Sequence, residues 1–292
     1  MRITVFSRGP SLYSTRRLVE AGKARMHWTE VTDHALCSPF LAQGNTAILL
    51  DGKPLDLPQV AIPRIGANIT ARGASIIRHL DILGVPHTLN ADALMLARDK
   101  MSCLQVLARN DVPIPQTILC FSTREARLAA KRMNSYPVVV KLLESTHGVG
   151  VALATTPFQL ERIVEGFLRF QDRVILQEYI AESRGVDIRA FVVGDRVVAT
   201  MERRATGDEF RANIHRGATA RAVQLSPEDE ALVLKAARLV GVEIAGVDLL
   251  PSQRGPLLME VNASPGLEGI EAATGVDIAG AIIDYAVSKV ST

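Results

Sequence analysis

The chain has 292 residues, of which 48% are hydrophobic and 22% charged, and a formal net charge of +2. That length allows two globular domains, and the small net charge argues against a general nucleic-acid binder. No apolar run approaches the roughly eighteen residues of a membrane-spanning helix, and the first residues enter a strand pattern without a signal peptide, so we expect a cytoplasmic protein. Three cysteines without a C-x-x-C pair predict reduced, structural thiols.

The first hundred residues predict an α/β unit in which strands and helices alternate. The expected elements are a strand at residues 2–6, a helix at 12–24, a strand at 27–32, a short hairpin at 47–55, a strand at 59–63 and a helix at 70–83. Arg64 directly follows the last strand, and the carboxyl ends of strands are where open α/β sheets bind ligands. Arg64 is therefore a candidate for binding an anionic substrate, with a structural ion pair as the alternative.

Residues 90–107 predict one continuous helix capped by Asn90, and we place a domain boundary near residue 98. A proline-containing linker, a helix at 122–134 and an apolar strand at 137–142 follow. Lys141 interrupts the apolar strand. A lysine there needs an anionic partner unless its side chain reaches the surface.

A glycine-containing loop follows this strand. Gly148 and Gly150 allow the backbone N–H groups to turn inward and form a nest for phosphate, before a second strand at 151–154. The loop lacks the further glycine of a dinucleotide fingerprint, and no P-loop motif occurs in the chain. These residues predict either a loop that covers a nucleotide or an ordinary glycine turn.

The next segment predicts helices and strands together with an unusual concentration of arginine. The expected elements are a helix at 158–170, a strand at 174–180, a hairpin of 187–193 with 196–203, a helix at 227–239 capped by Ser226 and a terminal helix at 280–289. Residues 184–221 contain eight arginines, five acidic residues and no lysine. Arginine favours bidentate recognition of carboxylates or phosphates, and a solvated charged face is the alternative.

A hairpin of residues 244–250 and 257–261 carries Asp248 and Glu260. If five residues, 252–256, form its loop, Asp248 lies directly opposite Glu260, and Asn262 shares their face of the sheet. Two carboxylates and an amide oxygen favour magnesium or manganese shared with a phosphate. The alternative is a pair of solvated surface carboxylates. Ser264, in the turn that follows, adds a hydroxyl beside this face.

The chain resembles ATP-grasp ligases over almost its whole length, and specifically the RimK type, the ribosomal-protein α-L-glutamate ligases. The motifs that carry the resemblance are Pro63-Arg64-Ile65-Gly66, Arg98-Asp99-Lys100, Gln177-Glu178-Tyr179-Ile180, Glu202-Arg203-Arg204-Ala205, His215-Arg216-Gly217 and the stretch MEVNASPGLEGIE. The resemblance implies an α/β N-terminal domain (1–98) followed by an α+β ATP-grasp fold, whose subdomains (99–178 and 179–292) clasp ATP.

The resemblance also implies roles for individual residues. The implied ATP-binding residues are Lys100, Lys141, Gly148, Gly150, Glu178, Tyr179, Ile180, Asp187, Arg211, Ala212 and Asn213. The implied ligands of two magnesium or manganese ions are Asp248, Glu260 and Asn262; the implied catalytic residues are Arg203 and Arg211; and the substrate-binding candidates are Arg64, Arg216 and Ser264. Ser145 departs from the glycine usual in the family's loop.

The activity that the resemblance implies is ATP-dependent addition of L-glutamate, through an acyl phosphate, to the acidic C-terminal tail of the sixth small-subunit ribosomal protein, or the making of poly-α-glutamate. Another amino acid or a carrier-protein or small-peptide substrate is the first alternative. A non-catalytic nucleotide-binding regulator is the second. We expect no membrane partner and no direct nucleic-acid binding, and the sequence leaves a homo-oligomer open.

Overall fold

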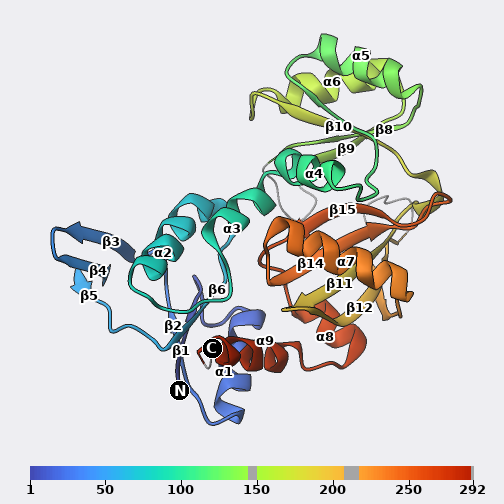
Figure 1. Cartoon of the computed structure of the whole chain (residues 1–292). Helices are drawn as coiled ribbons and strands as arrows, with labels where there is room; N and C mark the ends of the chain where they lie inside the picture. Colours follow the sequence, from blue (N-terminus) through green and yellow to red (C-terminus); the bar gives the residue numbers. More distant parts are fainter. Residues whose placement is uncertain (144–149, 207–216, 291–292) are drawn as a thin grey trace.

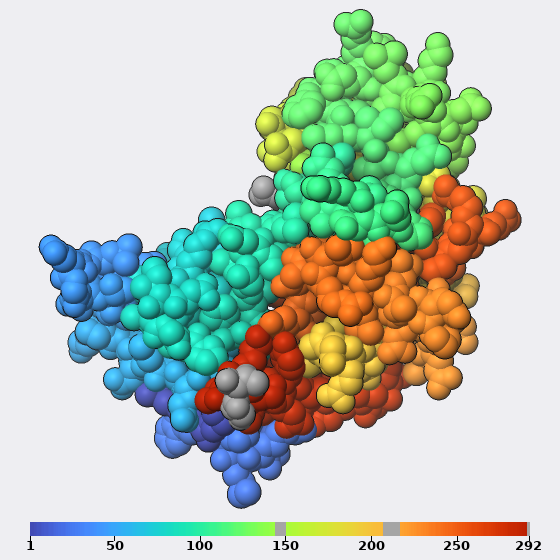
Figure 2. Space-filling view, in the orientation of Figure 1, coloured from blue at the N-terminus to red at the C-terminus, as the bar shows by residue number. Residues whose placement is uncertain are grey.

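The computed structural model describes residues 1–143, 150–206 and 217–290. The chain forms three parts, which Figure 1 shows as a blue and cyan N-terminal part, a green lobe and an orange and red C-terminal part. In the space-filling view of Figure 2, the green lobe projects from a broader body that the other two parts form together. No helix among the described residues combines the length and the apolar character needed to cross a membrane.

A three-stranded parallel sheet in the order β2, β1, β6 forms the centre of the N-terminal part. Its elements are β1 (Arg2–Phe6), α1 (Tyr13–Ala24), β2 (Trp28–Thr32), β6 (Val60–Pro63), the 3₁₀ helix η1 (Ala67–Ile69) and α2 (Thr70–Ile82). Ile3 and Val5 pack with α1 on one face, whereas Phe6 and Ala61 pack with α2 on the other. Helices therefore cover both faces, as expected for a parallel sheet, and the predicted α/β unit is confirmed.

The segment of the chain that links β2 to β6 forms a small antiparallel sheet, in blue at the left of Figure 1. It consists of β3 (Cys37–Ala42), β4 (Asn45–Leu50) and β5 (Lys53–Pro54). The predicted hairpin corresponds to β4 and β5, which turn at Asp51 and Gly52 with positive φ angles of 49° and 78°. β3 was not predicted because Pro39 interrupts its pattern; β3 is an edge strand, where proline is tolerated.

The prediction of a single helix after Asn90 is wrong. The segment forms two helices, α3 (Ala91–Arg98) and α4 (Lys100–Arg109). Asp99 leaves the helical conformation at φ −86° and ψ 101°, and its carboxylate accepts hydrogen bonds from the N–H groups of Met101 and Ser102, both at 3.0 Å. Asp99 thus caps the second helix and ends the first, because an aspartate side chain competes for backbone N–H groups.

The central lobe is a four-stranded antiparallel sheet in the order β7, β10, β8, β9, with two helices on one face. Its elements are β7 (Thr117–Cys120), α5 (Thr123–Met133), β8 (Val138–Lys141), β9 (Val151–Ala154), α6 (Pro157–Phe167) and β10 (Val174–Glu178). Val138 and Val140 pack beneath the helices. Because side chains alternate along a strand, Lys141 of β8 lies on the opposite face, away from α5 and α6.

The C-terminal part contains a five-stranded antiparallel sheet in the order β13, β12, β11, β14, β15. Its elements are the 3₁₀ helix η2 (Ala181–Ser183), β11 (Val186–Val193), β12 (Arg196–Arg204), β13 (Thr219–Ala222), α7 (Pro227–Val240), β14 (Ile244–Leu250), β15 (Leu257–Asn262), α8 (Glu268–Thr274) and α9 (Ile278–Ser288). The Ser226 hydroxyl accepts the N–H of Asp229 at 3.1 Å, which confirms the predicted cap of α7. The chain then returns to its beginning, because Ile278 and Ile282 of α9 pack in one core with Ile3.

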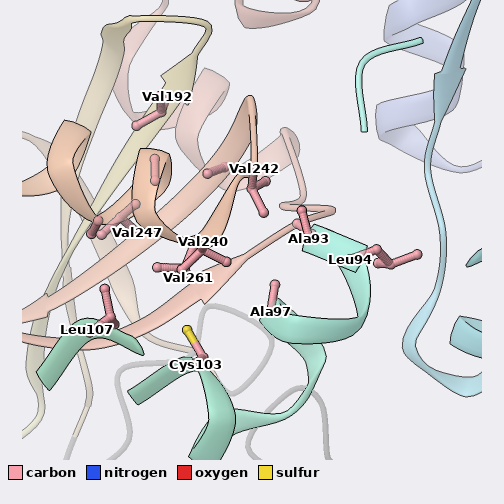
Figure 3. Close-up of a cluster of buried hydrophobic side chains, with 14 of the residues drawn as sticks. Ala93, Leu94, Ala97, Cys103, Leu107, Val192, Val240, Val242, Val247 and Val261 are labelled. Atoms are coloured by element: carbon pink, nitrogen blue, oxygen red, sulfur yellow. The ribbon is translucent and has the colours of Figure 1, made fainter. Parts of the chain in front are cut away.

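Helices α3 and α4 are fixed against the C-terminal sheet by the apolar cluster of Figure 3. Ala93, Ala97 and Leu107 lie in this buried cluster with Val240 of α7 and Val261 of β15. The packing holds the carboxyl end of α3 beside β15. The strand that carries Glu260 is therefore close to the junction of all three parts of the chain.

Candidate active site

Asp248 and Glu260 occupy paired positions on β14 and β15, as the sequence predicted. Directly opposed residues of an antiparallel pair project to the same face of a sheet. Asn262 shares this face because it lies two residues after Glu260 on the same strand. Two carboxylates and one amide are therefore presented together.

The loop that produces this alignment differs from the prediction. Leu250 pairs with Leu257, so six residues, 251–256, separate the strands instead of five. A β-bulge between Asp248 and Leu249 then shifts the register by one residue. Without the bulge, Met259 would lie opposite Asp248, and Glu260 would project to the other face.

Asp248 is 3% exposed and is held by two arginines. Arg189 donates from Nε to Oδ1 and from Nη2 to Oδ2, both at 2.7 Å, and Nη2 of Arg203 donates to Oδ2 at 3.0 Å. Burial alone would raise the pKa of Asp248, but the two positive charges outweigh burial and lower it. Asp248 is therefore an anion whose position is fixed by bidentate hydrogen bonding.

Arg203 connects Asp248 to Asp187. It donates from Nε and Nη2 to the two oxygens of Asp187, at 2.6 and 2.9 Å, and all three side chains are buried. Burial raises the pKa of Asp187, and the neighbouring Asp248 adds to the rise, whereas Arg203 opposes it. A ribose hydroxyl at Asp187 would have to share oxygens that already accept from Arg203.

Lys141 reaches the same site from the central lobe. Its Nζ donates to Oε1 of Gln177 at 2.6 Å, and burial lowers its pKa to about 8, although the charges of Glu260 and Asp248 favour the protonated form. Lys100 contributes a second positive charge and donates to the backbone oxygen of Leu143 at 2.9 Å. Lys141 of the lobe and Lys100 of α4 therefore bring two ammonium groups close to each other, and Lys141 is also close enough to Asp248 and Glu260 to be influenced by their charges.

The oxygen atoms of Asp248, Glu260 and Asn262 decide whether this face can hold a metal ion. No group of three or more His, Cys, Asp or Glu side chains in the described part of the chain is placed to hold a metal ion. Glu260 forms no ion pair with a described residue, Oδ1 of Asp248 retains one lone pair beside its single hydrogen bond, and Asn262 adds an amide oxygen. These few oxygen donors fit magnesium that also binds phosphate and water, and they do not form an enclosing protein site.

Glu178, Tyr179 and Ile180 follow β10 in the segment that joins the lobe to the C-terminal sheet. The N–H of Glu178 donates to the backbone oxygen of Gln116 at 2.9 Å, and its carboxylate accepts from Arg254 at 2.6 Å. Ile180 is buried, and its backbone oxygen accepts from the N–H of Ser183. An adenine contact through the N–H of Glu178 or the backbone oxygen of Ile180 would therefore compete with an existing hydrogen bond.

Several predicted site residues lie outside the described residues: Gly148, Arg211, Ala212, Asn213 and Arg216, together with Ser145. Gly150 is described and has a φ of +76°. A Cβ atom at Gly150 would come within 2.7 Å of Leu142, so the position demands glycine for both its conformation and its packing.

Arg64 and Ser264, the remaining substrate candidates, lie where β6 meets the turn after β15. Nη2 of Arg64 donates to the backbone oxygen of Pro265, and burial, followed by the charge of Arg98, lowers the pKa of Arg64 to about 10. The Ser264 hydroxyl is buried and has no partner among the described residues. The structure therefore brings a second arginine, Arg98, to this point.

Neither Arg189 nor Arg98 is among the site residues predicted from the sequence. Arg189 stands two residues after Asp187 on β11 and pairs with Asp248 in the sheet register. A search for Asp-x-Arg in a strand beside the carboxylate hairpin would have found it, because alternate residues share a face. Arg98 belongs to one of the motifs that carry the resemblance, but no spacing rule indicates its role, because its location depends on the break between α3 and α4.

The fold and this site define an ATP-grasp ligase, an ATP-dependent enzyme that forms C–N bonds. The D-alanine–D-alanine ligase from Coxiella burnetii has a similar fold, with a TM-score of 0.70 over 99% of this chain and 96% of that chain, at 15% identity. A RimK domain ATP-grasp protein from Sphaerobacter thermophilus matches with a TM-score of 0.74 and 26% identity over 98% of this chain and 100% of that chain.

The family follows from the sequence matches. Residues 1–94 match the RimK PreATP-grasp domain, and residues 97–286 match the RimK-like ATP-grasp domain. A probable α-L-glutamate ligase of Cellvibrio japonicus is 46% identical over 285 residues, covering 98% of this chain and 95% of the relative. Another, from Aeromonas salmonicida, is 43% identical over 291 residues, covering 100% and 98%. The chain belongs to the RimK-like ATP-grasp family.

Proposed function

We propose that this ligase adds L-glutamate to an acidic peptide, with the C-terminal tail of the sixth small-subunit ribosomal protein as the expected acceptor and poly-α-glutamate as a related product. The observation that carries the proposal is the pairing of Asp248 with Glu260 on β14 and β15, with Asn262 on the same face, close to the ammonium group of Lys141 from the lobe. The names of the relatives, probable α-L-glutamate ligases, support glutamate as the added amino acid.

ATP lies, in this proposal, between subdomains 99–178 and 179–292, with residues 1–98 as a separate N-terminal domain. Lys100 and Lys141 bind phosphate oxygens, with the loop of Gly148 and Gly150 covering them. The remaining proposed ATP contacts are Glu178, Tyr179, Ile180, Asp187, Arg211, Ala212 and Asn213. The buried location of the Lys141 ammonium supports its role, since a phosphate supplies the anion that burial demands.

Asp248, Glu260 and Asn262 would hold magnesium or manganese, as two ions. Bound metal would neutralise charge on the phosphoryl group during transfer. Arg189 and Arg203 orient the Asp248 carboxylate, because three hydrogen bonds fix it before any ligand binds. A solved ATP-grasp relative, PsnB, is described in complex with Mg and ADP, which supports magnesium here.

The reaction proceeds in two steps. An oxygen of the acceptor carboxylate attacks the γ-phosphorus of ATP, the bond to the bridging oxygen breaks, and ADP leaves with that electron pair. The amine of glutamate then attacks the acyl carbon of the resulting acyl phosphate, loses a proton, and phosphate leaves as the C–O bond breaks. Arg203 and Arg211 are the proposed stabilisers of the negative charge. Arg203 retains Nη1, which makes no hydrogen bond to a described residue.

Mass spectrometry tests the function directly. An acceptor peptide with an acidic C-terminus is incubated with ATP, magnesium and each amino acid in turn, and ADP release is followed in parallel. We expect stepwise glutamyl additions and ADP release that depends on glutamate. A product containing a different amino acid, or a carrier-protein or small-peptide acceptor, would replace this assignment. ATP binding without any ligation would favour a regulatory protein.

A further inference from the structure

We propose that Arg64, Arg98 and Ser264 form a pocket that binds a carboxylate of the acidic substrate, which belongs either to free L-glutamate or to the terminal residue of the acceptor. The inference rests on the proposed function for the identity of that acid. It concerns a part of the site where three segments distant in the sequence meet: the end of β6, the end of α3 and the turn after β15.

Arg64 connects the N-terminal sheet to this turn. It directly follows β6, and its Nη2 donates to the backbone oxygen of Pro265, three residues after Asn262. That hydrogen bond uses one of the five N–H groups of the guanidinium. The others make no hydrogen bond to a described residue.

Arg98 reaches the same place from the end of α3. Its Nη2 donates to the backbone oxygen of Ile65 at 2.6 Å, whereas its Nε is buried and has no partner in the described ranges. Burial lowers the pKa of Arg98, and Arg98 in turn lowers that of Arg64, so the two positive charges are close enough to repel each other.

No described carboxylate forms an ion pair with either arginine; both donate to backbone carbonyl groups instead. Arg98 lies at the carboxyl end of α3, where the helix dipole partly stabilises its positive charge. The positive charge of Arg64 is not stabilised in this way. Two adjacent, partly buried guanidinium groups that donate to backbone oxygens and to no described carboxylate point to an anionic ligand, and a carboxylate matches their planar donors.

Glu260 is close to this pocket and to the proposed phosphate site. Its charge acts on both Arg98 and Lys141. The Ser264 hydroxyl, buried and without a described partner, stands beside the pocket, while its backbone N–H donates to Oδ1 of Asn262 at 3.0 Å. ATP phosphates are thus held from the lobe, and the substrate carboxylate is held from the N-terminal side.

Steady-state kinetics of Arg64→Gln and Arg98→Gln test the pocket. We expect the KM for one acidic substrate to rise about tenfold or more, with the KM for ATP changed by less than about twofold, because each variant removes a charge-assisted hydrogen bond to the carboxylate only. A rise in the KM for L-glutamate assigns the carboxylate to the free amino acid. A rise in the KM for the acceptor peptide assigns it to the acceptor.

Two further variants distinguish loss of the pocket from misfolding or a general loss of activity. Ser264→Ala removes one buried oxygen and should raise the same KM about threefold. Arg17→Gln is the matched control, since Arg17 also links the N-terminal and C-terminal parts but is paired with Glu271 and Asp277 at 3.1 and 3.0 Å. Arg17→Gln should leave every KM unchanged. Unaltered KM values for both acidic substrates in Arg98→Gln and Ser264→Ala would overturn the pocket.

Equilibrium binding separates this inference from the proposed function. Calorimetry with L-glutamate and with the acceptor peptide, on the wild type and on Arg98→Gln in the absence of ligation, measures the pocket alone. Wild-type binding that weakens about tenfold in the variant supports the pocket even if no glutamyl product forms, and such an outcome contradicts only the proposed function. Normal ligation with equal binding by both proteins contradicts only the pocket.

Discussion

Two pairs of arginines flank the carboxylates of β14 and β15, and their surroundings differ. Arg189 and Arg203 donate at least five hydrogen bonds to Asp187 and Asp248. Arg64 and Arg98 donate to backbone carbonyl groups and form no ion pair with a described carboxylate. The first pair has its anions within the fold, so it builds the site. The second pair has only the charge of Glu260, which acts on Arg98 without forming an ion pair, so we assign its bound anion to a ligand.

The largest expected effect comes from removing the charge that the first pair shares. Asp248→Asn leaves Arg189 and Arg203 without their common counter-ion in a buried location, so we expect the free energy of unfolding to fall by about 3–5 kcal/mol and ligation to be lost. Urea denaturation and ADP release measure the two effects. Glu260→Gln is the control: it should abolish ligation with a change in unfolding free energy below about 1 kcal/mol, because Glu260 forms no ion pair with a described residue. Equal destabilisation by both variants would contradict the comparison.

Arg203→Ala should have the next largest effect. We expect kcat for glutamate transfer to fall roughly 10²- to 10³-fold, which corresponds to about 2–4 kcal/mol of transition-state stabilisation, with a smaller change in the Kd for ATP. Arg216→Ala, at a position outside the described residues, should behave similarly. Kinetics and nucleotide titration check the two quantities. Equal losses of ATP binding and of transfer would assign Arg203 to the nucleotide and not to the substrate.

Lys141 should make the affinity for ATP depend on pH, an effect not expected from the arginines. Its pKa is lowered from 10.5 to about 8, so its positive charge is present below pH 8 and is lost as the pH rises further. The affinity of the free enzyme for ATP should therefore decline above about pH 8, where the phosphates remain fully ionised. Measuring kcat/KM for ATP from pH 6.5 to 9.5 shows the decline. In Lys141→Arg the profile should be flat, since arginine keeps its charge.

The smallest effect is expected at an exposed arginine. Arg254 pairs with Glu178 at 2.6 Å, but its side chain is 51% exposed. Exposed pairs contribute little, so Arg254→Ala should change the free energy of unfolding by less than about 1 kcal/mol. Thermal unfolding of this variant beside Asp248→Asn then compares a solvated arginine pair with a buried one. A loss comparable to that of Asp248→Asn would show that burial does not decide the difference.

Local patterns predicted most of the elements that position the site. Apolar alternation and turn chemistry located β14 and β15, and Ser226 marked the start of α7. Two of the elements that were missed, β7 and β13, depend on pairing with another strand. β7 has only four residues and exists because it pairs with β10, and β13 pairs with β12. Neither strand is long enough to show a period of its own.

The candidate site was predictable in its acidic residues and less so in its arginines. Asp248, Glu260 and Asn262 lie within one hairpin, so the sequence brings them near one another, but their common face depends on the β-bulge after Asp248, which spacing does not reveal. The role of Arg98 depends on Asp99, whose side chain ends α3 and starts α4. Helical periodicity runs through Asp99 without interruption, and the competition between its carboxylate and the helical hydrogen bonds is decided only in the folded chain.

The β-bulge after Asp248 makes the alignment of the carboxylates sensitive to the parity of the loop that joins their strands. With six residues in the loop and one in the bulge, Asp248 and Glu260 project to the same face. If the six-residue turn is kept, inserting or deleting one residue before Leu257 would place Met259 or Val261 opposite Asp248 and turn Glu260 to the other face. A deletion accompanied by loss of the bulge would restore the pair of Asp248 and Glu260. The lengths of the loop and of the bulge therefore have to change together if this pair is to be kept.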